Sequence, residues 1–355
     1  MQQTVGMDVA STYMRSEILE QPEVLERLLE AEGPRVDRIA GAIRAFDPYF
    51  VMMVARGSSD NAALYGKYLL GAINRLPVAL AAPSLVTLYR SPPNLSRALV
   101  IAISQSGRSP DLLEVVCSAR RQGAMTVAAT NNPSSPLAER CEWVIPLHAG
   151  RERSVAATKS YTAQLLALAM LSASLSVRPE LAEELRALPE SVQLALEAES
   201  AARKAALWLK GASRCVVIGR GFDYATAQEI ALKLKELAAV AAEPYSAADF
   251  MHGPVAMVEP GFPAVLVAHS GAAYREMRRL AARLQRLGAD LIAISDRRWI
   301  LDTASVGLPV GSTVSEWLSP LVSVVPGQML ALHLAVEKGM DPDRPRRLTK
   351  VTRTR

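Results

Sequence analysis

Residues 99–113, LVIAISQSGRSPDLL, join an apolar segment directly to a polar turn and then to a helix start. Residues 99–103 form a continuous apolar run of the length expected for a buried parallel strand. The turn at residues 104–109 follows, with three serines, a glutamine and a glycine. Pro110 and Asp111 suit a first helical turn, because proline matches its backbone angle and an acidic side chain complements the helix dipole. This order predicts a strand, a polar turn and a helix of a parallel α/β sheet.

The turn at residues 104–109 is a candidate anion site. Backbone N–H groups at a helix N-terminus have no partners within the helix and lie at the positive end of its dipole. The side chains of Ser104, Gln105, Ser106 and Ser109 add neutral hydrogen-bond donors. A phosphate is the most natural ligand for this set. The alternative interpretation is a serine-rich turn that caps an ordinary helix, because serine at a cap needs no ligand.

Length and composition indicate a two-domain α/β protein. The chain has 355 residues, half of them apolar and 5% aromatic, and a domain usually takes about 100–200 residues. The longest apolar run found, residues 163–175, is shorter than the ~20 residues of a membrane span. The N-terminus lacks the apolar region of a signal peptide. We therefore expect a cytoplasmic protein with no membrane partner.

Cysteine spacing and net charge argue against a metal-binding protein and a nucleic-acid-binding protein. Cys117, Cys141 and Cys215 occur singly in apolar surroundings, without metal-ligand spacing, and are expected to be core residues. The net charge of +5 is modest, and part of it comes from residues 344–355, RPRRLTKVTRTR. Basic residues elsewhere have acidic neighbours, so no nucleic-acid partner is expected. An anionic small substrate explains a local excess of positive charge equally well.

The same order of strand, turn and helix recurs along the chain. Residues 49–55 predict a strand that ends in RGSSDN, and a helix follows to about Ile73. Further strands are expected at residues 77–82, 99–103, 124–130 and 143–147, and long helices at residues 16–29 and 155–175. In the first of these helices Glu17, Glu20, Glu23 and Glu26 are expected on the outer face. The alternation predicts an α/β fold with doubly wound parallel sheets and helices on both faces.

Two of these turns are expected at one edge of the sheet. Ligands of open parallel sheets bind beyond the carboxyl ends of the strands. Gly57, Ser58 and Ser59 follow one strand, and the turn at residues 104–109 follows another. Neither a G-x-G-x-x-G fingerprint nor a P-loop occurs, which argues against a nucleotide-binding fold.

The second half of the chain repeats the first. Residues 51–57 (VMMVARG) align with residues 215–221 (CVVIGRG), and Ser106-Gly107 aligns with Ser270-Gly271, both at an offset of 164. Residues 124–131 align with residues 289–296 at an offset of 165. Three matches at nearly one offset indicate a duplicated domain. The second copy has HSGAA at residues 269–273, so only the first copy keeps the hydroxyl-rich turn.

A second set of ionisable residues lies between residues 229 and 252. On a helix Glu229, Lys233 and Glu236 are spaced i, i+4 and i, i+3, so they share one face. His252 follows in a loop next to a Gly-Pro pair. Two interpretations remain open for each feature. The acidic and basic residues form either a surface salt-bridge ladder or a catalytic group, and His252 is either a solvated imidazole or an acid–base group.

These residues resemble the sugar isomerase (SIS) domain family. The likeness is to the isomerase half of glucosamine-6-phosphate synthase and to the glucosamine-6-phosphate deaminases built on that half alone. The resemblance covers nearly the whole chain and rests on seven motifs in order: EILEQP (17–22), GSS (57–59), SQSG (104–107), VAATK (155–159), ALKLKE (231–236), HGP (252–254) and PRRLTK (345–350). It implies two tandem SIS domains of flavodoxin-like form. The expected parts are an N-terminal helical arm (1–46), SIS domain 1 with the phosphate site (47–180), a helical linker (181–212), SIS domain 2 (213–340) and a catalytic tail (341–355).

The resemblance also implies roles for individual residues. Ser104, Gln105, Ser106, Ser109 and Ser59 would bind the sugar phosphate. Further substrate contacts would come from Gly57, Ser58, Val155 and Ala157. Four residues would act in catalysis: Glu236 moves a proton between C1 and C2, His252 assists ring opening, Lys233 lies beside the open chain, and Lys350 reaches the carbonyl. No cofactor or metal is needed, and His252 would cross a homodimer interface, so the active sites are shared.

Departures from the family pattern narrow the expected activity. The chain begins Met1-Gln2-Gln3, without the cysteine that a glutaminase domain carries after its initiator methionine. We therefore expect no internal ammonia source, and either deamination of glucosamine 6-phosphate to fructose 6-phosphate and ammonia or simple isomerisation. Ala157 and Arg56 replace a serine and a cysteine of the pattern, and Arg108 replaces an acidic residue. The alternatives are a deaminase of galactosamine 6-phosphate or of a fructosamine phosphate, or a non-catalytic sugar-phosphate-binding regulator.

Overall fold

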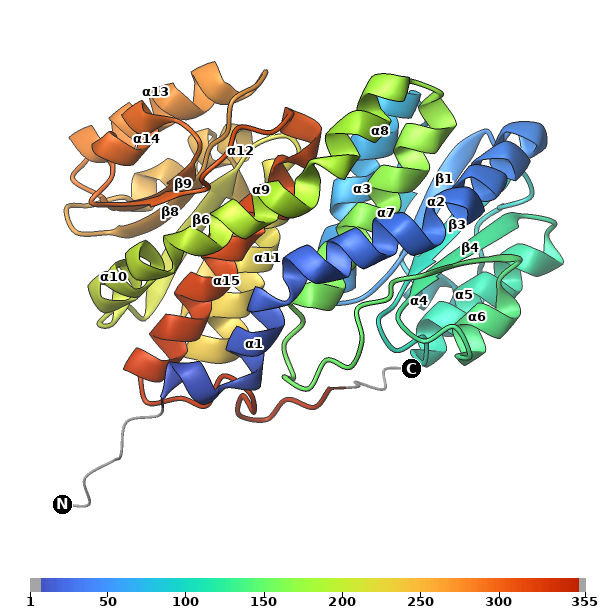
Figure 1. The fold of residues 1–355 in the computed structure, drawn as a ribbon, viewed down its shortest axis with the longest axis horizontal. Helices are drawn as coiled ribbons and strands as arrows, with labels where there is room; N and C mark the ends of the chain where they lie inside the picture. The colour runs from blue at the N-terminus through green and yellow to red at the C-terminus, as the bar shows by residue number, and fades with distance from the viewer. Residues whose placement is uncertain (1–7, 351–355) are drawn as a thin grey trace. The chain divides into compact units, whose positions relative to one another are not determined.

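The computed structural model describes residues 8–350. These residues form two compact units, each built around its own sheet (Figure 1). Of the described residues, the N-unit comprises residues 23–152, 159–187 and 349–350. The C-unit comprises residues 8–22, 153–158 and 188–348.

The sheet of the N-unit has five parallel strands in the order β2-β1-β3-β4-β5. The strands are β1 (Phe50–Val54), β2 (Val78–Leu80), β3 (Ala98–Ile103), β4 (Met125–Thr130) and β5 (Trp143–Pro146). Every residue of β3 and β4 is buried, as expected for central strands covered on both faces. The predicted strands and their parallel arrangement are confirmed, and the strand order is the flavodoxin-like one.

Helices cover both faces of this sheet. They are α2 (Gln21–Phe46), α3 (Ser58–Asn74), α4 (Ser84–Thr87), α5 (Pro110–Arg121), α6 (Pro136–Arg140), α7 (Lys159–Ser176) and α8 (Pro179–Arg186). On one face Leu112 and Val116 of α5 and Leu137 of α6 pack against Val54 and Val100 of the strands. The helices α3 and α7 pack together and contact β3 and β4, respectively.

The C-unit repeats this topology. Its parallel strands are β6 (Arg214–Gly219), β7 (Ala241–Ser246), β8 (Pro263–Val267), β9 (Asp290–Ser295) and β10 (Val306–Pro309). Their order, β10-β9-β8-β6-β7, is that of the first sheet when the strands are counted from β6. The same winding in two sheets agrees with the duplication inferred from the sequence.

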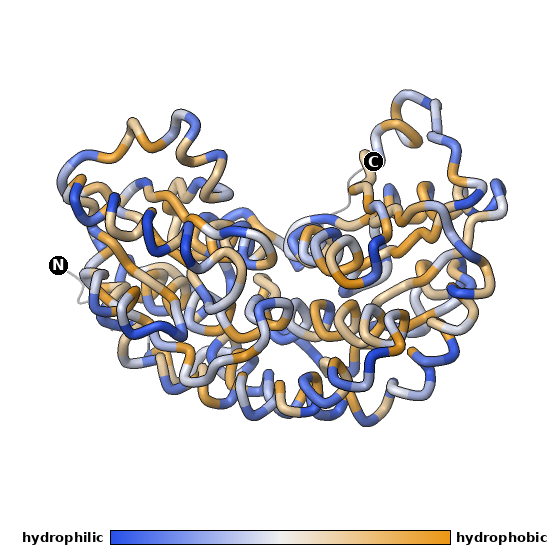
Figure 2. The backbone as a smooth tube through the Cα atoms, turned by 90° about the horizontal axis from the view of Figure 1, so that it is seen from above, coloured by the Kyte–Doolittle hydropathy of each residue, from blue (hydrophilic) through white to orange (hydrophobic). Residues whose placement is uncertain are grey.

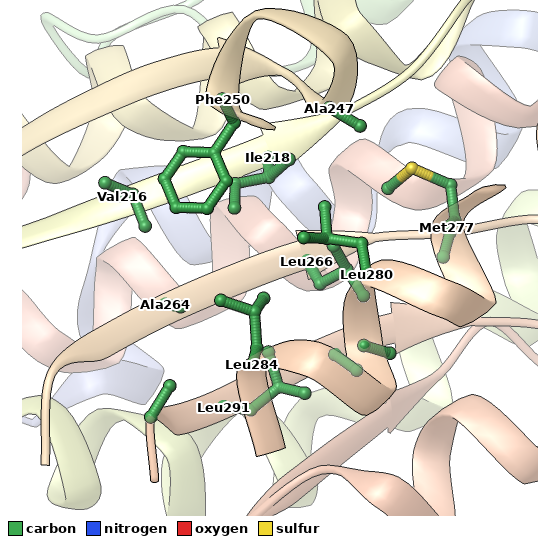
Figure 3. Close-up of a cluster of buried hydrophobic side chains, with 14 of the residues drawn as sticks. Val216, Ile218, Ala247, Phe250, Ala264, Leu266, Met277, Leu280, Leu284 and Leu291 are labelled. Carbon is green, nitrogen blue, oxygen red and sulfur yellow. The ribbon is translucent and has the colours of Figure 1, made fainter. Parts of the chain in front are cut away.

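The helices of the C-unit also form two layers. They are η1 (Val9–Ser11), α1 (Tyr13–Leu19), α9 (Leu188–Ala195), η2 (Leu196–Ala198), α10 (Glu199–Leu209), α11 (Asp223–Ala238), α12 (Ala247–Met251), η3 (Pro254–Met257), α13 (Tyr274–Arg286), α14 (Arg298–Thr303), η4 (Glu316–Leu318) and α15 (Ser319–Glu337). Figure 3 shows Phe250 of α12 and Met277 and Leu280 of α13 over Ile218 and Leu266 of the strands. The helices α10, α11 and α15 pack with one another, and Figure 1 shows α11 and α15 on the side of this sheet opposite α13. Figure 2 shows apolar strands in orange beside helices in which hydrophobic and hydrophilic residues alternate.

The segment Glu316–Glu337 is long and apolar enough to cross a membrane, with a mean hydropathy of 1.4. Of its most apolar 18-residue window, 94% is buried inside the structure, where α15 packs against α10 and α11. This burial is typical of a core helix. The segment is longer than residues 163–175, which the sequence had suggested as the longest apolar run.

Two helix predictions need correction. The helix expected at residues 16–29 is divided, because α1 ends at Leu19 and α2 begins at Gln21. Pro22 has no N–H to donate to the Ile18 carbonyl, and the Gln21 side chain donates to it instead, at 3.0 Å. The helix expected from residue 155 begins only at Lys159, because residues 153–158 form a loop of the C-unit.

Glu17 was expected on the outer face of its helix, and this prediction is wrong. The residue is only 3% exposed. Its carboxylate accepts hydrogen bonds from the backbone N–H groups of Arg153 and Ser154 and from the Ser154 hydroxyl. The loop donors would otherwise be buried without acceptors, so Glu17 faces them instead of solvent.

Two glycines test this packing in opposite directions. A Cβ on Gly327 of α15 would lie 2.4 Å from Ile230 of α11, whereas a Cβ on Gly41 of α2 would meet only the end of the Arg44 side chain, at 3.9 Å. Overpacking should make Gly327→Ala less stable by about 1–3 kcal/mol. Gly41→Ala should gain about 0.5–1 kcal/mol, because alanine loses less backbone entropy in a helix. Thermal unfolding of both variants measures the effects, and a shift of the same sign in both would contradict this account.

Candidate functional site

The turn after β3 is built by its own hydrogen bonds. The Ser104 N–H donates to the Ala129 carbonyl at 3.1 Å, and the Gly107 N–H donates to the Ser104 hydroxyl at 3.1 Å. Gly107 has φ +64°, and a Cβ there would lie 2.1 Å from the Ser135 hydroxyl oxygen. Only glycine fits this position, so the close turn after the strand depends on it.

Several donors of this turn are left without partners in their own chain. Within residues 8–350 the side chains of Gln105, Ser106 and Ser109 make no hydrogen bond, and all three are half-buried. Ser109 is the N-cap residue of α5, yet its side chain does not cap the helix. This weakens the interpretation of the turn as an ordinary serine cap. Neutral donors and a helix N-terminus converge there in a way that suits an anion.

The turn after β1 lies beside it, because β1 and β3 are neighbours in the sheet. Gly57 has φ +57° and precedes α3, and Ser58 and Ser59 form the first turn of that helix. Arg56 bonds through Nε to the Asp111 carboxylate of α5 at 2.7 Å, which ties the two turns together. The strand order reverses between β1 and β3, where ligands of this topology bind. The structure thus brings residues 57–59 and 104–109 to one edge, as predicted.

The ionisable residues of α11 form an internal cluster. The Lys233 side chain is 1% exposed, and its Nζ lies 2.5 Å from Glu236 and 3.4 Å from Glu229. Glu229 is fully buried, so these residues are not a surface salt-bridge ladder. The Glu236 carboxylate is 24% exposed, so one edge of the cluster reaches solvent.

The charges within this cluster depend on one another. Burial lowers the pKa of Lys233, but the carboxylates of Glu229 and Glu236 outweigh it and raise the pKa overall. The amine therefore stays protonated and holds Glu236 in place. A half-exposed carboxylate of this kind can accept and return a proton. An adjacent ammonium can stabilise an oxyanion that forms nearby.

Among the described residues, His252 is not bonded to the ionisable cluster of α11. It ends α12, precedes Gly253 with φ +151°, and has an exposed side chain. No hydrogen bond or ion pair joins its imidazole to Lys233, to Glu236 or to any other residue in the described part of the chain. The structure of one chain therefore does not bring His252 into the cluster.

Lys350 has a partner that sequence reasoning missed. Its Nζ lies 2.6 Å from the Glu152 carboxylate, which is fully buried. Glu152 also accepts from the Ser160 N–H at 3.1 Å and from the Ser160 hydroxyl at 2.7 Å. The only sequence feature that could have drawn attention to Glu152 is its position just before the VAATK motif. Lys350 is the only lysine among residues 341–350. The Glu152 carboxylate therefore fixes the position of its ammonium group in the N-unit.

Val155 and Ala157 lie in the loop of the C-unit that Glu17 holds, and both are half-buried. The Val155 N–H donates to the Asp343 carbonyl at 3.2 Å. Asp343 in turn accepts from the N–H groups of Tyr13 and Met14 at 2.9 and 2.8 Å, at the start of α1. The two ends of the C-unit chain thus fix this loop. Over residues 8–350, no group of three or more His, Cys, Asp or Glu residues is arranged to hold a metal ion.

Comparisons with known proteins agree with this arrangement. The family model described as SIS domain matches residues 50–174 and 208–338, one match in each half of the chain. A curated relative, the isomerizing glutamine–fructose-6-phosphate aminotransferase of Thermococcus kodakarensis, is 37% identical over 348 residues. That alignment covers 95% of this chain and 57% of the relative, so the chain spans little more than half the length of the enzyme it matches.

Two solved structures have the same fold over almost their full length. A protein of Silicibacter pomeroyi DSS-3, described provisionally as a phosphosugar isomerase, is 36% identical with a TM-score of 0.84. The match covers 94% of this chain and all of that one. The C-terminal domain of glucosamine-fructose-6-phosphate aminotransferase from Francisella tularensis is 27% identical with a TM-score of 0.86, covering 94% and 98% of the two chains.

Removal of the buried ammonium tests the charge balance of the α11 cluster. Lys233→Met leaves the Glu229 carboxylate without its cation, and breaking a buried ion pair costs about 3–5 kcal/mol. The double variant Lys233→Met/Glu229→Gln removes both charges and should recover most of that stability. Chemical denaturation of the wild type and both variants measures this. Equal stability of the single variant and the wild type would show that the pair does not hold α11 in place.

Proposed function

Because this chain belongs to the SIS domain family, we propose that it is an amino-sugar phosphate deaminase and aldose–ketose isomerase. The proposed reaction converts glucosamine 6-phosphate and water to fructose 6-phosphate and ammonia. The observation that carries the proposal is the contact of 2.5 Å between the buried Lys233 ammonium and the half-exposed Glu236 carboxylate. A fold alone does not imply an activity, so the proposal depends on this geometry.

Glu236 supplies the base for the central step. Its carboxylate removes the proton from C2 of the open-chain amino aldose, and the electrons form an enolamine between C1 and C2. The same carboxyl then returns a proton to C1, which leaves a C2 imine. Water adds to this imine, and ammonia leaves as the C2 ketone forms. The Lys233 ammonium stabilises the oxyanion that develops at O1.

The far end of the substrate needs a separate anchor. The phosphate would bind at Ser104, Gln105, Ser106 and Ser109, with Ser59 of the neighbouring turn. The free side-chain donors at Gln105, Ser106 and Ser109 support this assignment. Anchoring a remote group fixes the position of the reacting carbons, which is a large part of what an enzyme contributes.

The sugar itself would contact four further residues. These residues are Gly57, Ser58, Val155 and Ala157. Gly57 and Ser58 flank the phosphate turn, and Val155 and Ala157 lie in the loop held by Glu17. We assign no cofactor.

His252 would assist ring opening from a second copy of the chain. Its exposed imidazole, which has no partner among residues 8–350, supports a homodimer with shared active sites. Lys350 would reach the carbonyl of the open chain, and its contact with Glu152 supports a defined starting position. The free cysteines, two of them buried, agree with a cytoplasmic enzyme.

Other substrates have a specific observation in their favour. Arg56, which replaces a cysteine of the family pattern, is tied to Asp111 next to the phosphate turn. This change makes galactosamine 6-phosphate or a fructosamine phosphate the second candidate substrate. A sugar-phosphate-binding regulator would use the phosphate turn alone and would leave the Glu236 cluster without a role.

A panel of amino-sugar 6-phosphates tests the proposal directly. We expect the purified protein to release ammonia from glucosamine 6-phosphate and to form an equal amount of fructose 6-phosphate. Release from another member of the panel would reassign the substrate. Tight binding of a sugar phosphate without ammonia or ketose formation would favour the regulator and contradict the enzyme.

Glu236→Gln separates catalysis from binding. The amide keeps the size of the side chain but cannot act as a base, so turnover should fall by about 10²–10⁴-fold. Fructose 6-phosphate should still bind with nearly the wild-type affinity in calorimetry. Glu259→Gln, which changes an exposed carboxylate of the same unit, is the matched control and should leave turnover unchanged. Normal turnover in Glu236→Gln would remove this residue from the mechanism.

Lys350→Met tests the tail lysine. Loss of a cation at the carbonyl should lower kcat by about 10²-fold. The melting temperature should fall less than in Lys233→Met, because Glu152 keeps its hydrogen bonds from Ser160 and the Lys350 side chain is already 27% exposed. Lys210→Met removes an exposed lysine paired with Glu337 and serves as the control. If both variants retain the wild-type rate, Lys350 is a structural partner of Glu152 and not a catalytic residue.

A further inference from the structure

The C-unit contains a counterpart of the phosphate turn. Residues 268–273 (AHSGAA) connect β8 to α13 as residues 104–109 connect β3 to α5, at the offset of 164 that relates the two halves. The Ala268 N–H donates to the Ile294 carbonyl at 3.0 Å, as the Ser104 N–H does to Ala129 at 3.1 Å. Both turns contain a glycine with positive φ, Gly107 in the first and Gly271 in the second. The backbone framework of the anion turn is therefore present twice.

The two turns differ in what their donors contact. In the second turn the Ala272 N–H donates to one Glu316 carboxylate oxygen at 2.7 Å, and the Ala273 N–H donates to the other at 3.2 Å. A Cβ on Gly271 would lie 2.4 Å from this carboxylate, so the group lies directly against the turn. Glu316 comes from η4, 44 residues along the chain from Ala272. An anion is thus already bound at the start of α13, and it belongs to the chain itself.

A second carboxylate, that of Asp296, accepts hydrogen bonds from the same turn. Asp296 accepts from the backbone N–H of Ser270 at 3.0 Å and also from the Ser270 hydroxyl. In the first turn the equivalent hydroxyl, that of Ser106, has no partner within residues 8–350. The polar donors of the second turn are therefore satisfied by two negative charges.

A buried histidine lies in the same turn. His269 is 4% exposed, and its Nδ1 lies 3.4 Å from the Asp223 carboxylate. Burial lowers its pKa, but the negative charges of Asp223, Asp296 and Glu316 outweigh burial and raise the pKa overall. These carboxylates therefore favour the protonated form of the imidazole over the neutral form. The arrangement is an internal ion cluster, which an ordinary solvated loop would not need.

We propose that residues 268–273 form an anion-binding turn that the Glu316 carboxylate occupies permanently, so that each chain has one phosphate site and not two. The proposal rests on the proposed function only in assigning phosphate to the first turn. A phosphate at the second turn would have to displace Glu316 and approach Asp296, and both carboxylates repel it. Because Glu316 is tethered beside the turn, its effective concentration exceeds that of a free anion at millimolar levels.

Anion placement in crystals tests this proposal. Crystals of the wild type, of Glu316→Ala and of Glu259→Ala are soaked in sodium selenate, whose selenium is located by anomalous scattering. We expect one selenate per chain in the wild type, at the turn of residues 104–109. Glu316→Ala should bind a second selenate at the N–H groups of Ala272 and Ala273. Glu259→Ala removes an exposed carboxylate of the same unit and should bind only one, which excludes an effect of net charge.

The outcomes of the selenate experiment distinguish this proposal from the proposed function. A second selenate in the wild type, or none at the second turn of a folded Glu316→Ala, would overturn the proposal. If Glu316→Ala does not fold, Glu316→Ser replaces it, because serine keeps a polar side chain on η4 but removes the carboxylate, and a second selenate is again expected. Selenate at the second turn of the variant but nowhere in the wild type would contradict the proposed function and leave this inference intact.

Discussion

A single buried ammonium constrains much of the C-unit. Lys233 is almost completely enclosed, and a charge in that position is tolerated only with close counter-charges. Glu229 and Glu236 supply them from one face of α11. The same helix packs closely against α15, where Ile230 lies against Gly327. In the proposed function, stability and proton transfer would depend on the same three side chains.

The two halves show how one topology is adapted to two purposes. Both sheets have the same strand order and the same kind of turn at the reversal point. The first turn has serine hydroxyls and a carboxamide, which can bind an external anion without adding charge. The second keeps one of these hydroxyls, that of Ser270, and its donors are bonded to Asp296 and Glu316. A duplicated fold therefore does not imply a duplicated site, because function lies in the side chains placed on it.

Local patterns predicted the strands, the turn at residues 104–109 and the common face of Glu229, Lys233 and Glu236. Each of these depends on spacings of a few residues. The sequence did not predict that Glu17 is buried or that Glu152 holds Lys350. The partners in these contacts are 137 and 198 residues apart. Nothing in either local pattern identifies the partner, since only the tertiary fold brings the two segments together.

Proton exchange in heavy water tests the central claim most directly. Fructose 6-phosphate is incubated with the enzyme in D2O without ammonia, and NMR follows deuterium at C1. Because Glu236 would remove and return a proton at adjacent carbons, the account predicts steady deuterium incorporation that depends on the enzyme. Fructose 6-phosphate that binds to the protein but gains no deuterium would contradict it.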